Sequence, residues 1–201
     1  ESILGVFPIE KGKITLNDQE INLLNTRERR EFGISFIPED RQSQGLLMDV
    51  SLSENMILGR QSTSAYKSKY SNIIYSQANQ DSQLVIENYD VRTPGNKTLA
   101  LALSGGNQQK FVVGRELEDN PKLLIASQPT RGIDIGAQSL IWNKLRDARD
   151  SGLGVLLISA DLDELIGLSD RIHVIYEGEF VKEINPEDAT PELLGGYMTG
   201  L

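Results

Sequence analysis

The sequence predicts an α/β fold with a mostly parallel sheet and a helical insertion. From about residue 104 onward, short apolar segments typical of buried strands alternate with helical patterns. Such alternation is typical of βαβ units, which place their strands parallel in one sheet. Before it, the stretch from about 42 to 103 is mostly helical in pattern, which indicates an insertion into the α/β core.

The expected elements follow from capping and breaking signals at their ends. Thr26 is the expected N-cap of the polar helix 27–31, and Gly33 is its expected stop. The other expected elements, in chain order, are a helix tail at 1–4 capped by Gly5, strands at 13–16 and 34–37, a helix opened by Ser51 or Ser53, a loop or irregular helices at 61–75, helices at 76–88 and after Ser104, a strand at 123–126, a helix at 137–150, a strand at 155–158, a helix at 162–166, strands at 171–176 and 180–182, and a last short helix from Pro191.

The composition is that of a globular protein and narrows the choice of partners. The 201 residues carry 29 Asp and Glu against 20 Lys and Arg, a formal net charge of −9. Because nucleic-acid binding usually needs a basic face, we expect no nucleic-acid partner. The absence of cysteine excludes disulfides and thiolate metal sites and fits the cytoplasm. No apolar run reaches the ~20 residues that span a bilayer, and the start at Glu1 shows no signal-peptide pattern.

Ser104-Gly105-Gly106 stands directly before a helical pattern and is the first candidate binding site. The N-terminus of a helix offers free N–H groups and the positive end of the helix dipole, both of which attract phosphate. Glycines let the backbone approach a ligand closely, and the Ser104 hydroxyl adds one hydrogen bond. The same residues also fit an ordinary Ser N-cap behind a glycine-rich turn, so by themselves they leave both interpretations open.

The context of this loop favours the phosphate-binding interpretation. Ser127 follows Ser104 by 23 positions, at the end of an apolar strand, and Asp134 follows seven positions later. With these motifs the chain resembles, over nearly its whole length, the ATP-binding cassette of ABC transporters. The matching segments are Leu103–Asn107 for the signature LSGGQ, with Asn107 replacing Gln, Lys122–Thr130 for the Walker B strand with its Pro-Thr, and Asp134 for the D-loop Asp.

A finer resemblance points to one branch of that family. Pro38–Arg41, Leu103–Lys110 and Pro129–Asp134 look like bacterial carbohydrate and nucleoside importer ATPases, which carry two cassettes in one polypeptide. The chain looks like the second cassette. The resemblance implies a P-loop NTPase core of ABC type, with about 1–40 and 104–201 as the core and about 41–103 as a helical subdomain. No G-x-x-x-x-G-K-[ST] motif occurs, so we expect a single partial cassette whose N-terminal Walker A part is missing because the chain begins too late.

The resemblance also implies roles for individual residues. Those expected at ATP are Ser104, Gly105, Gly106, Asn107, Gln108, Asp134 and Glu39, the last in place of the Q-loop Gln. Ser127 stands at the position of the Mg²⁺-associated Asp, and we do not expect its neutral hydroxyl to be a ligand. Gln128 stands at the position of the catalytic Glu, and an amide cannot act as a general base. Ala160 stands at the position of the switch His.

Together, Ser127, Gln128 and Ala160 predict a degenerate ATP site on this chain; harmless drift in a still active site is the alternative. In the family, two cassettes sandwich two nucleotides head to tail, so each signature serves the site on the other cassette. The resemblance therefore implies the energy-coupling ATPase subunit of a bacterial sugar or nucleoside importer, which binds ATP and Mg²⁺ when intact. We expect the chain alone to be inactive.

The implied partners are the N-terminal cassette of the same polypeptide and the transmembrane permease subunits. They would place the chain at the cytoplasmic face of the bacterial plasma membrane. Glu39-Asp40-Arg41 falls where the family's Q-loop faces the membrane subunits; an ordinary charged loop is the alternative. Two other functions stay open: a soluble ABC-type module acting on ribosomes or DNA, which the acidic charge disfavours, and an inactive interaction domain, which the intact Ser104–Gly106 disfavours.

Three other features are best explained by structure rather than chemistry. The arginines of helix 27–31, flanked by Glu28 and Glu31, are typical of a solvated helix with i,i+3 and i,i+4 pairing. His173 lies on an expected strand and has no second His or Cys to form a metal site, so we expect a structural role. Trp142 belongs to an amphipathic pattern, which indicates core packing.

Overall fold

A parallel sheet forms the centre of the structure, a computed structural model that describes residues 1–70 and 72–200. Ser71, in the stretch expected as a loop or irregular helices, and Leu201 lie outside the described residues. The hydrogen-bonded strand order is β3–β4–β5, and the strands are β3 (Ile34–Ile37), β4 (Leu123–Ser127) and β5 (Gly154–Ile158). Two antiparallel hairpins accompany the sheet: β1 (Thr15–Leu16) with β2 (Gln19–Glu20), and β6 (Ile172–Tyr176) with β7 (Glu179–Ile184).

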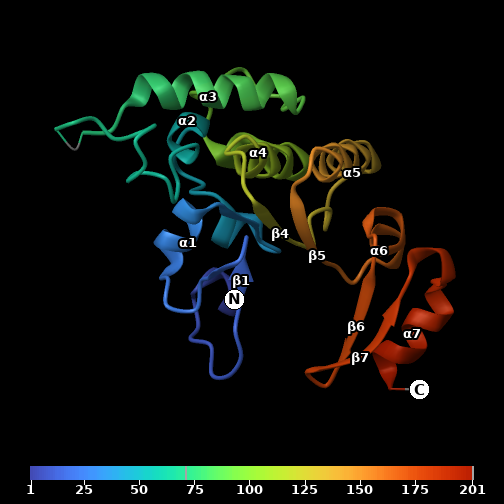
Figure 1. Ribbon diagram of the computed structural model, residues 1–201. Coiled ribbons are helices and arrows are strands. Elements are labelled where there is room, and N and C mark those ends of the chain that lie inside the picture. The colour runs from blue at the N-terminus through green and yellow to red at the C-terminus, as the bar shows by residue number, and fades with distance from the viewer. Residues whose placement is uncertain (71, 201) are drawn as a thin grey trace.

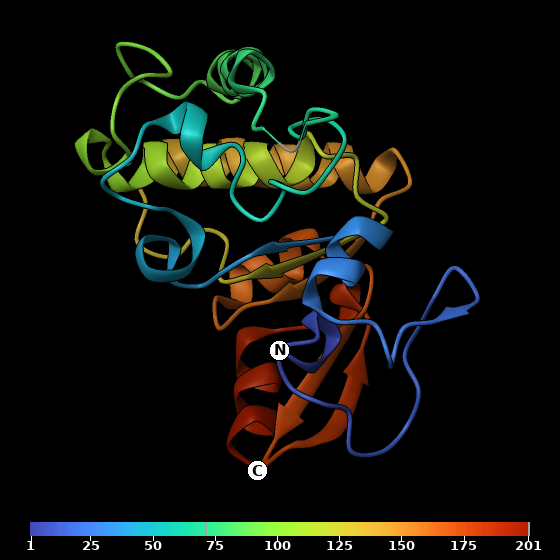
Figure 2. The same cartoon turned by 90° about the vertical axis from the view of Figure 1, so that its left-hand side faces the viewer.

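The helices are α1 (Thr26–Phe32), α2 (Leu52–Asn55), α3 (Tyr75–Asn88), α4 (Gly105–Leu117), α5 (Ile135–Asp150), α6 (Leu162–Leu168) and α7 (Pro191–Thr199). Helices α2 to α5 lie over one face of the sheet (Figure 1). Helices α4 and α5 run side by side above the strands, whereas α6 and α7 lie beside the β6–β7 hairpin (Figures 1 and 2). Within residues 1–70 and 72–200, every helix is too short or too polar to cross a membrane.

The prediction of an α/β fold with a parallel sheet is confirmed. Phe36, Ile125 and Leu156 pair in register across the three strands, so the same face of each strand lies on the same side of the sheet. In the described part of the chain, β5 is hydrogen-bonded along one side only, to β4. Its alternate side chains Leu156 and Ile158 are 38% and 50% exposed.

Capping boxes fix the N-termini of α1 and α2, and the first of them corrects the expected N-cap. The N-cap of α1 is Asn25 rather than Thr26, because Asn25 and Glu28 form a reciprocal capping box that satisfies two backbone N–H groups. Ser51 and Glu54 form the same arrangement at α2, which settles the choice between Ser51 and Ser53.

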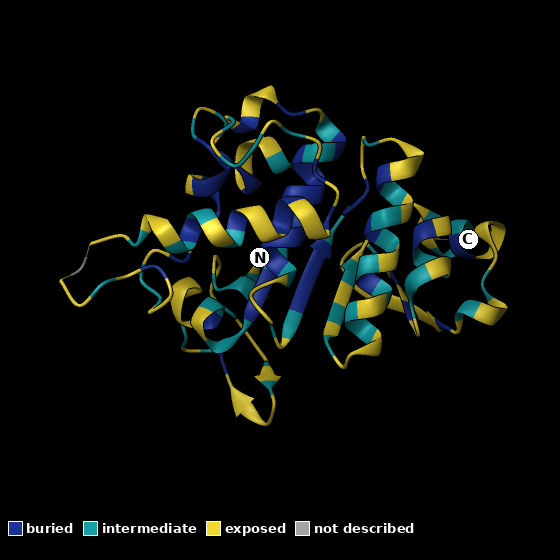
Figure 3. Ribbon diagram, turned by 90° about the horizontal axis from the view of Figure 1, so that it is seen from above, coloured by how far each residue is buried: buried dark blue, intermediate teal, exposed yellow. Residues whose placement is uncertain are grey.

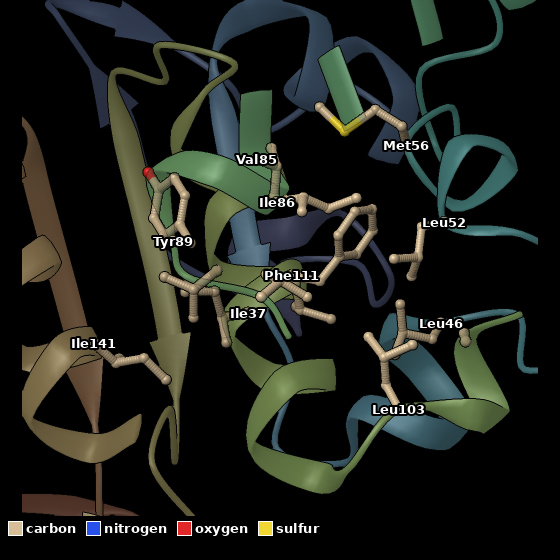
Figure 4. Close-up of a cluster of buried hydrophobic side chains, with 14 of the residues drawn as sticks. Ile37, Leu46, Leu52, Met56, Val85, Ile86, Tyr89, Leu103, Phe111 and Ile141 are labelled. Atoms are coloured by element: carbon tan, nitrogen blue, oxygen red, sulfur yellow. The ribbon is translucent and has the colours of Figure 1, made fainter. Parts of the chain in front are cut away.

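The main apolar cluster joins the helical insertion to the sheet. Phe111 of α4 is fully buried at its centre, with Ile37 of β3 on one side and Leu52 and Ile86 of the insertion on the other (Figure 4). Burial is concentrated along α4 and the central strands, whereas the β1–β2 hairpin is largely exposed (Figure 3). The insertion and the core therefore share one continuous set of buried side chains.

The arginines of α1 correct the expectation of a solvated face. Arg27 does pair with Glu31 at the surface, at 2.8 Å. Arg29, however, is 2% exposed and donates to four backbone carbonyls, those of Ser2, Ile3, Asn22 and Leu24. Arg30 points inward to Glu116. The spacing of charges in the sequence predicted that these arginines pair with acidic residues on the surface of α1. Instead, Arg29 binds backbone carbonyls outside the helix, and Arg30 binds the carboxylate of Glu116.

Glu116 of α4 is a fully buried carboxylate surrounded by three arginines. Its oxygens accept from Arg115 Nε at 2.9 Å, Arg30 Nη1 at 3.0 Å and Arg60 Nη2 at 3.5 Å, and the backbone N–H of Phe36 donates to it at 3.5 Å. These donors come from α1, β3, α4 and the insertion. Burial alone raises the pKa of Glu116, but the three guanidinium groups outweigh it and lower the pKa to about 2.

Replacing Glu116 by Gln should destabilise the chain by about 3–5 kcal/mol, because it leaves three arginine charges around a neutral, buried amide. Urea unfolding followed by circular dichroism measures the change. The matched control is Glu31→Gln, which removes a carboxylate from an exposed ion pair and should leave the free energy of unfolding nearly unchanged. Equal, small effects from both variants would contradict the role assigned to Glu116.

The same carboxylate predicts a pH dependence of folding. Its pKa is about 2 in the folded chain, against a usual value of 4.5, so the carboxylate contributes stability above pH 4.5. That contribution, about 3 kcal/mol, is lost as the pH falls from about 4.5 to about 2. The difference in unfolding free energy between the wild type and Glu116→Gln should narrow over this range, as measured by urea unfolding at several pH values. A difference independent of pH would exclude an ionised Glu116.

Candidate functional site

The N-terminus of α4 presents the glycine-rich loop at the surface. Ser104 is exposed and is the N-cap of this 13-residue helix. A Cβ at Gly105 would lie 2.6 Å from Arg41 Nη2, and one at Gly106 would lie 3.0 Å from a carboxylate oxygen of Asp134. The absence of Cβ atoms therefore allows two charged groups to approach the positive end of the helix.

Asn107 and Gln108, the next two residues, hold this loop together. Asn107 Nδ2 donates to Ser104 Oγ at 2.9 Å, and Asn107 Oδ1 accepts from the backbone N–H of Arg92 at 2.9 Å. Gln108 is 2% exposed, and its amide donates to two carbonyls of the preceding segment at 3.1 and 3.3 Å. In the structure Gln108 supports the segment before the loop, and its expected contact with ATP stays a prediction.

Ser127 ends β4, and Gln128 begins the turn that follows. Gln128 has a φ of 49°, in the left-handed region that non-glycine residues rarely adopt. Its backbone N–H donates to the carbonyl of Ile158 at 2.7 Å, and its Oε1 accepts from Ser159 Oγ at 3.4 Å. Ser159 directly precedes the exposed Ala160. The three residues expected to form a degenerate site therefore lie together, at the C-terminal edge of the sheet.

The loop from Pro129 to Asp134 connects this edge to α4 and α5. Gln109 Nε2 of α4 donates to the carbonyl of Pro129 at 2.7 Å. Asp134 is the N-cap of α5, and its Oδ1 accepts from the backbone N–H of Ala137 at 3.0 Å. This hydrogen bond holds the pKa of Asp134 below its usual value, so a charged carboxylate lies beside Gly106.

An open cleft of about 690 Å³ lies on the face of the sheet opposite the main cluster. Its polar rim includes Glu39, Arg41, Ser127 and Arg131, and its apolar floor includes Phe36, Ile125, Leu156 and Ile158. Glu39 and Arg131 form an ion pair across the rim. Ser104–Gly106 does not line this cleft. The structure therefore brings Glu39 and Ser127 together and places the glycine-rich loop outside.

The donor set of this chain does not fit a resident Mg²⁺ ion. Among the described residues, no group of three or more His, Cys, Asp or Glu side chains could hold a metal. Ser127 contributes a neutral hydroxyl, whereas Mg²⁺ is bound mainly by carboxylate and phosphate oxygens.

Sequence reasoning missed a buried carboxylate behind the 129–134 loop. Glu164 of α6 is 1% exposed and accepts hydrogen bonds from Thr130 Oγ1 at 2.7 Å and from Trp142 Nε1 at 3.0 Å. Trp142, expected in the core, is half-buried and uses its N–H for this contact. The two donors lie 34 and 22 positions from Glu164, so no local signal identifies the cluster. His173, expected to be structural, lies edge-on against Phe180.

A comparison with known families decides the class of this protein. The family model described as ABC transporter matches residues 1–131, a range that contains the glycine-rich loop, Ser127 and Gln128. This chain belongs to the ABC transporter family. The order of its motifs is thereby explained by common descent rather than by chance.

Curated relatives match the chain over its whole length. The guanosine import ATP-binding protein NupO of Bacillus subtilis is 44% identical, over 100% of this chain and 39% of that protein. The nucleoside import ATP-binding protein NupA of Lactococcus lactis is 40% identical, over 100% and 39%. The ribose import ATP-binding protein RbsA of Oceanobacillus iheyensis is 34% identical, over 99% and 40%. The chain thus spans about two-fifths of the length of these relatives.

Solved structures confirm the ABC ATPase fold. The ATP-binding cassette MJ1267 superimposes with a TM-score of 0.78 at 20% identity, over 99% of this chain and 79% of that one. The cassette MJ0796, in a dimeric state bound to ADP and Pi, superimposes with a TM-score of 0.71 at 19% identity, over 88% and 74%.

Proposed function

We propose that this chain is the energy-coupling cassette of a bacterial ABC importer for nucleosides or simple sugars, and that its signature loop completes the ATP site of a partner cassette. The position of the loop carries the proposal. Ser104–Gly106 has phosphate-binding chemistry, yet it lies outside the cleft that contains Ser127 and Glu39. A nucleotide held by another cassette gives this loop a ligand. The similarity to guanosine, nucleoside and ribose import ATP-binding proteins supports the substrate class.

The chain's own site is proposed to be degenerate. Ser127 lacks the charge to anchor Mg²⁺, Gln128 can orient a water but cannot take its proton, and Ala160 has no group to sense the γ-phosphate. In this proposal one of the two sites hydrolyses ATP, and it is built on the partner cassette. ATP-driven closure of the two cassettes then moves the membrane subunits.

The proposed partners are the other cassette of the same polypeptide and the permease subunits, at the cytoplasmic face of the membrane. The lengths of the relatives leave room for a second cassette of similar size. The short helical turn Arg41–Gly45 and the following Leu47, which is 52% exposed, form the surface that we assign to the permease.

Changing Gly105 to Asp should abolish ATP turnover in the full-length two-cassette protein. The new carboxylate would stand against phosphate, and its Cβ would displace Arg41, 2.6 Å away. The rate of phosphate release under saturating Mg-ATP measures the effect, and we expect this rate to fall at least about a hundredfold.

The matched control is Gly195→Asp. This glycine lies in α7, and a Cβ added there would meet no neighbouring atom within 4 Å, so the position has room for a side chain. The control should turn over ATP like the wild type. Normal activity of Gly105→Asp, with both variants folded, would refute donation of the signature.

The isolated chain should bind Mg-ATP with millimolar affinity or not at all, because the sequence contains no Walker A motif. Calorimetric titration and a phosphate-release assay on the same sample measure binding and turnover. Tight binding with turnover would mean that this chain holds the phosphates on residues other than a Walker A loop, and the proposed inactivity would be wrong.

A further inference from the structure

We propose that Arg41 is a positioning residue: its guanidinium clamps the 129–134 loop to the signature loop and so couples the cleft of this chain to the ATP site that the signature serves. The inference rests on the proposed function, because it concerns how the donated loop is held in place.

The contacts of Arg41 join three segments that are far apart in sequence. Arg41 begins the turn after β3, and its Nη1 and Nη2 donate to the carbonyls of Arg131 at 3.0 Å and Gly132 at 3.5 Å. Its Nη2 also occupies the space that a Cβ at Gly105 would need. A planar guanidinium holds its two terminal nitrogens in a fixed fork, whereas an ammonium group donates from a single nitrogen on a flexible stem.

Other hydrogen bonds complete a closed triangle around the clamp. Gln42 Nε2 donates to Gln108 Oε1 at 3.1 Å, which connects the 41–45 turn to α4. Gln109 Nε2 donates to Pro129 O at 2.7 Å, which connects α4 to the 129–134 loop. Hydrogen bonds therefore connect each two of the three segments, which are the 41–45 turn, α4 and the 129–134 loop. Arg41, in the 41–45 turn, contacts both the 129–134 loop and the start of α4. The three loops are expected to move together.

The arrangement is not the one that stability alone would favour. Among the described residues, Arg41 Nε is a buried donor without a hydrogen-bond partner. An unsatisfied buried donor is unfavourable, and such groups in native proteins often have a functional reason. Moreover, the missing Cβ of Gly105 leaves the space that Arg41 Nη2 occupies.

Arg41 also faces the cleft, which gives the clamp a signalling role. It lines the cleft with Glu39, and Glu39 pairs with Arg131, whose carbonyl Arg41 binds. A group that binds at this part of the rim contacts or displaces Arg41, Glu39 or Arg131. Because the guanidinium packs on Gly105, that displacement reaches the signature loop directly.

The test compares Arg41→Ala, Arg41→Lys and Arg27→Ala in the full-length protein. Arg27→Ala is the control, because it removes an arginine from an exposed helical ion pair. Steady-state hydrolysis gives kcat and KM for ATP, and hydrogen exchange reports the amides of 104–108 and 131–134.

We expect Arg41→Ala to lower kcat about tenfold to a hundredfold, with KM changed less than about threefold, and to speed exchange in both loops. Arg41→Lys should recover little activity, because it restores the charge but not the fork. Arg27→Ala should match the wild type in every measurement.

Three outcomes would overturn the clamp. The first two are an unchanged kcat in Arg41→Ala and an unchanged rate of hydrogen exchange in either loop of that variant. The third is full recovery of activity by Arg41→Lys, which would show that only the positive charge of residue 41 matters. The Gly105→Asp variant separates this failure from that of the proposed function. If Gly105→Asp is inactive while Arg41→Ala is fully active, the signature is donated without the clamp. If Gly105→Asp is active, signature donation itself is wrong.

Discussion

The buried cluster around Glu116 is the interaction on which the rest of the structure depends. One carboxylate accepts hydrogen bonds from Arg30 of α1, Arg60 of the insertion and Arg115 of α4. Arg115 in turn donates to the carbonyl of Asn55 at the end of α2. Hydrophobic packing between core and insertion is not directional and would allow several relative positions. Buried, hydrogen-bonded ion pairs allow only one position, because any other leaves a buried charge without a partner.

Helix α4 carries this fixed arrangement to the surface. Glu116 follows Ser104 by 12 positions, which corresponds to about 18 Å along a helix. The inner end of α4 is anchored by the arginines, its middle by Phe111 in the apolar cluster, and its outer end presents the signature loop. The loop is thus at one end of a helix whose orientation relative to the sheet and the insertion is set by buried contacts. The proposed donation of this loop to a nucleotide on another cassette requires such a fixed orientation.

The sequence predicted what depends on local pattern and missed what depends on distant partners. Strand alternation indicated β4 and β5, and Ser51 and Ser104 marked their helix starts, because caps and periodicity act within a few residues. The motif spacing located Ser127, Gln128 and Asp134. Arg29, Glu116 and Glu164 were missed or misjudged, because their partners lie in other elements and no spacing rule relates them.

The two glycines of the signature explain how this chain could keep an intact loop under the proposal that its own catalytic positions are degenerate. Ser127 and Gln128 lie half-buried at the C-terminal edge of the sheet and Ala160 is exposed, so none of the three is part of the buried core. Gly105 and Gly106 are constrained twice: by the phosphate approach that we propose, and by Arg41 and Asp134, which occupy the space of their missing Cβ atoms. In this proposal a substitution there disturbs both the loop of this chain and the ATP site of its partner, so the signature is retained independently of the chain's own site.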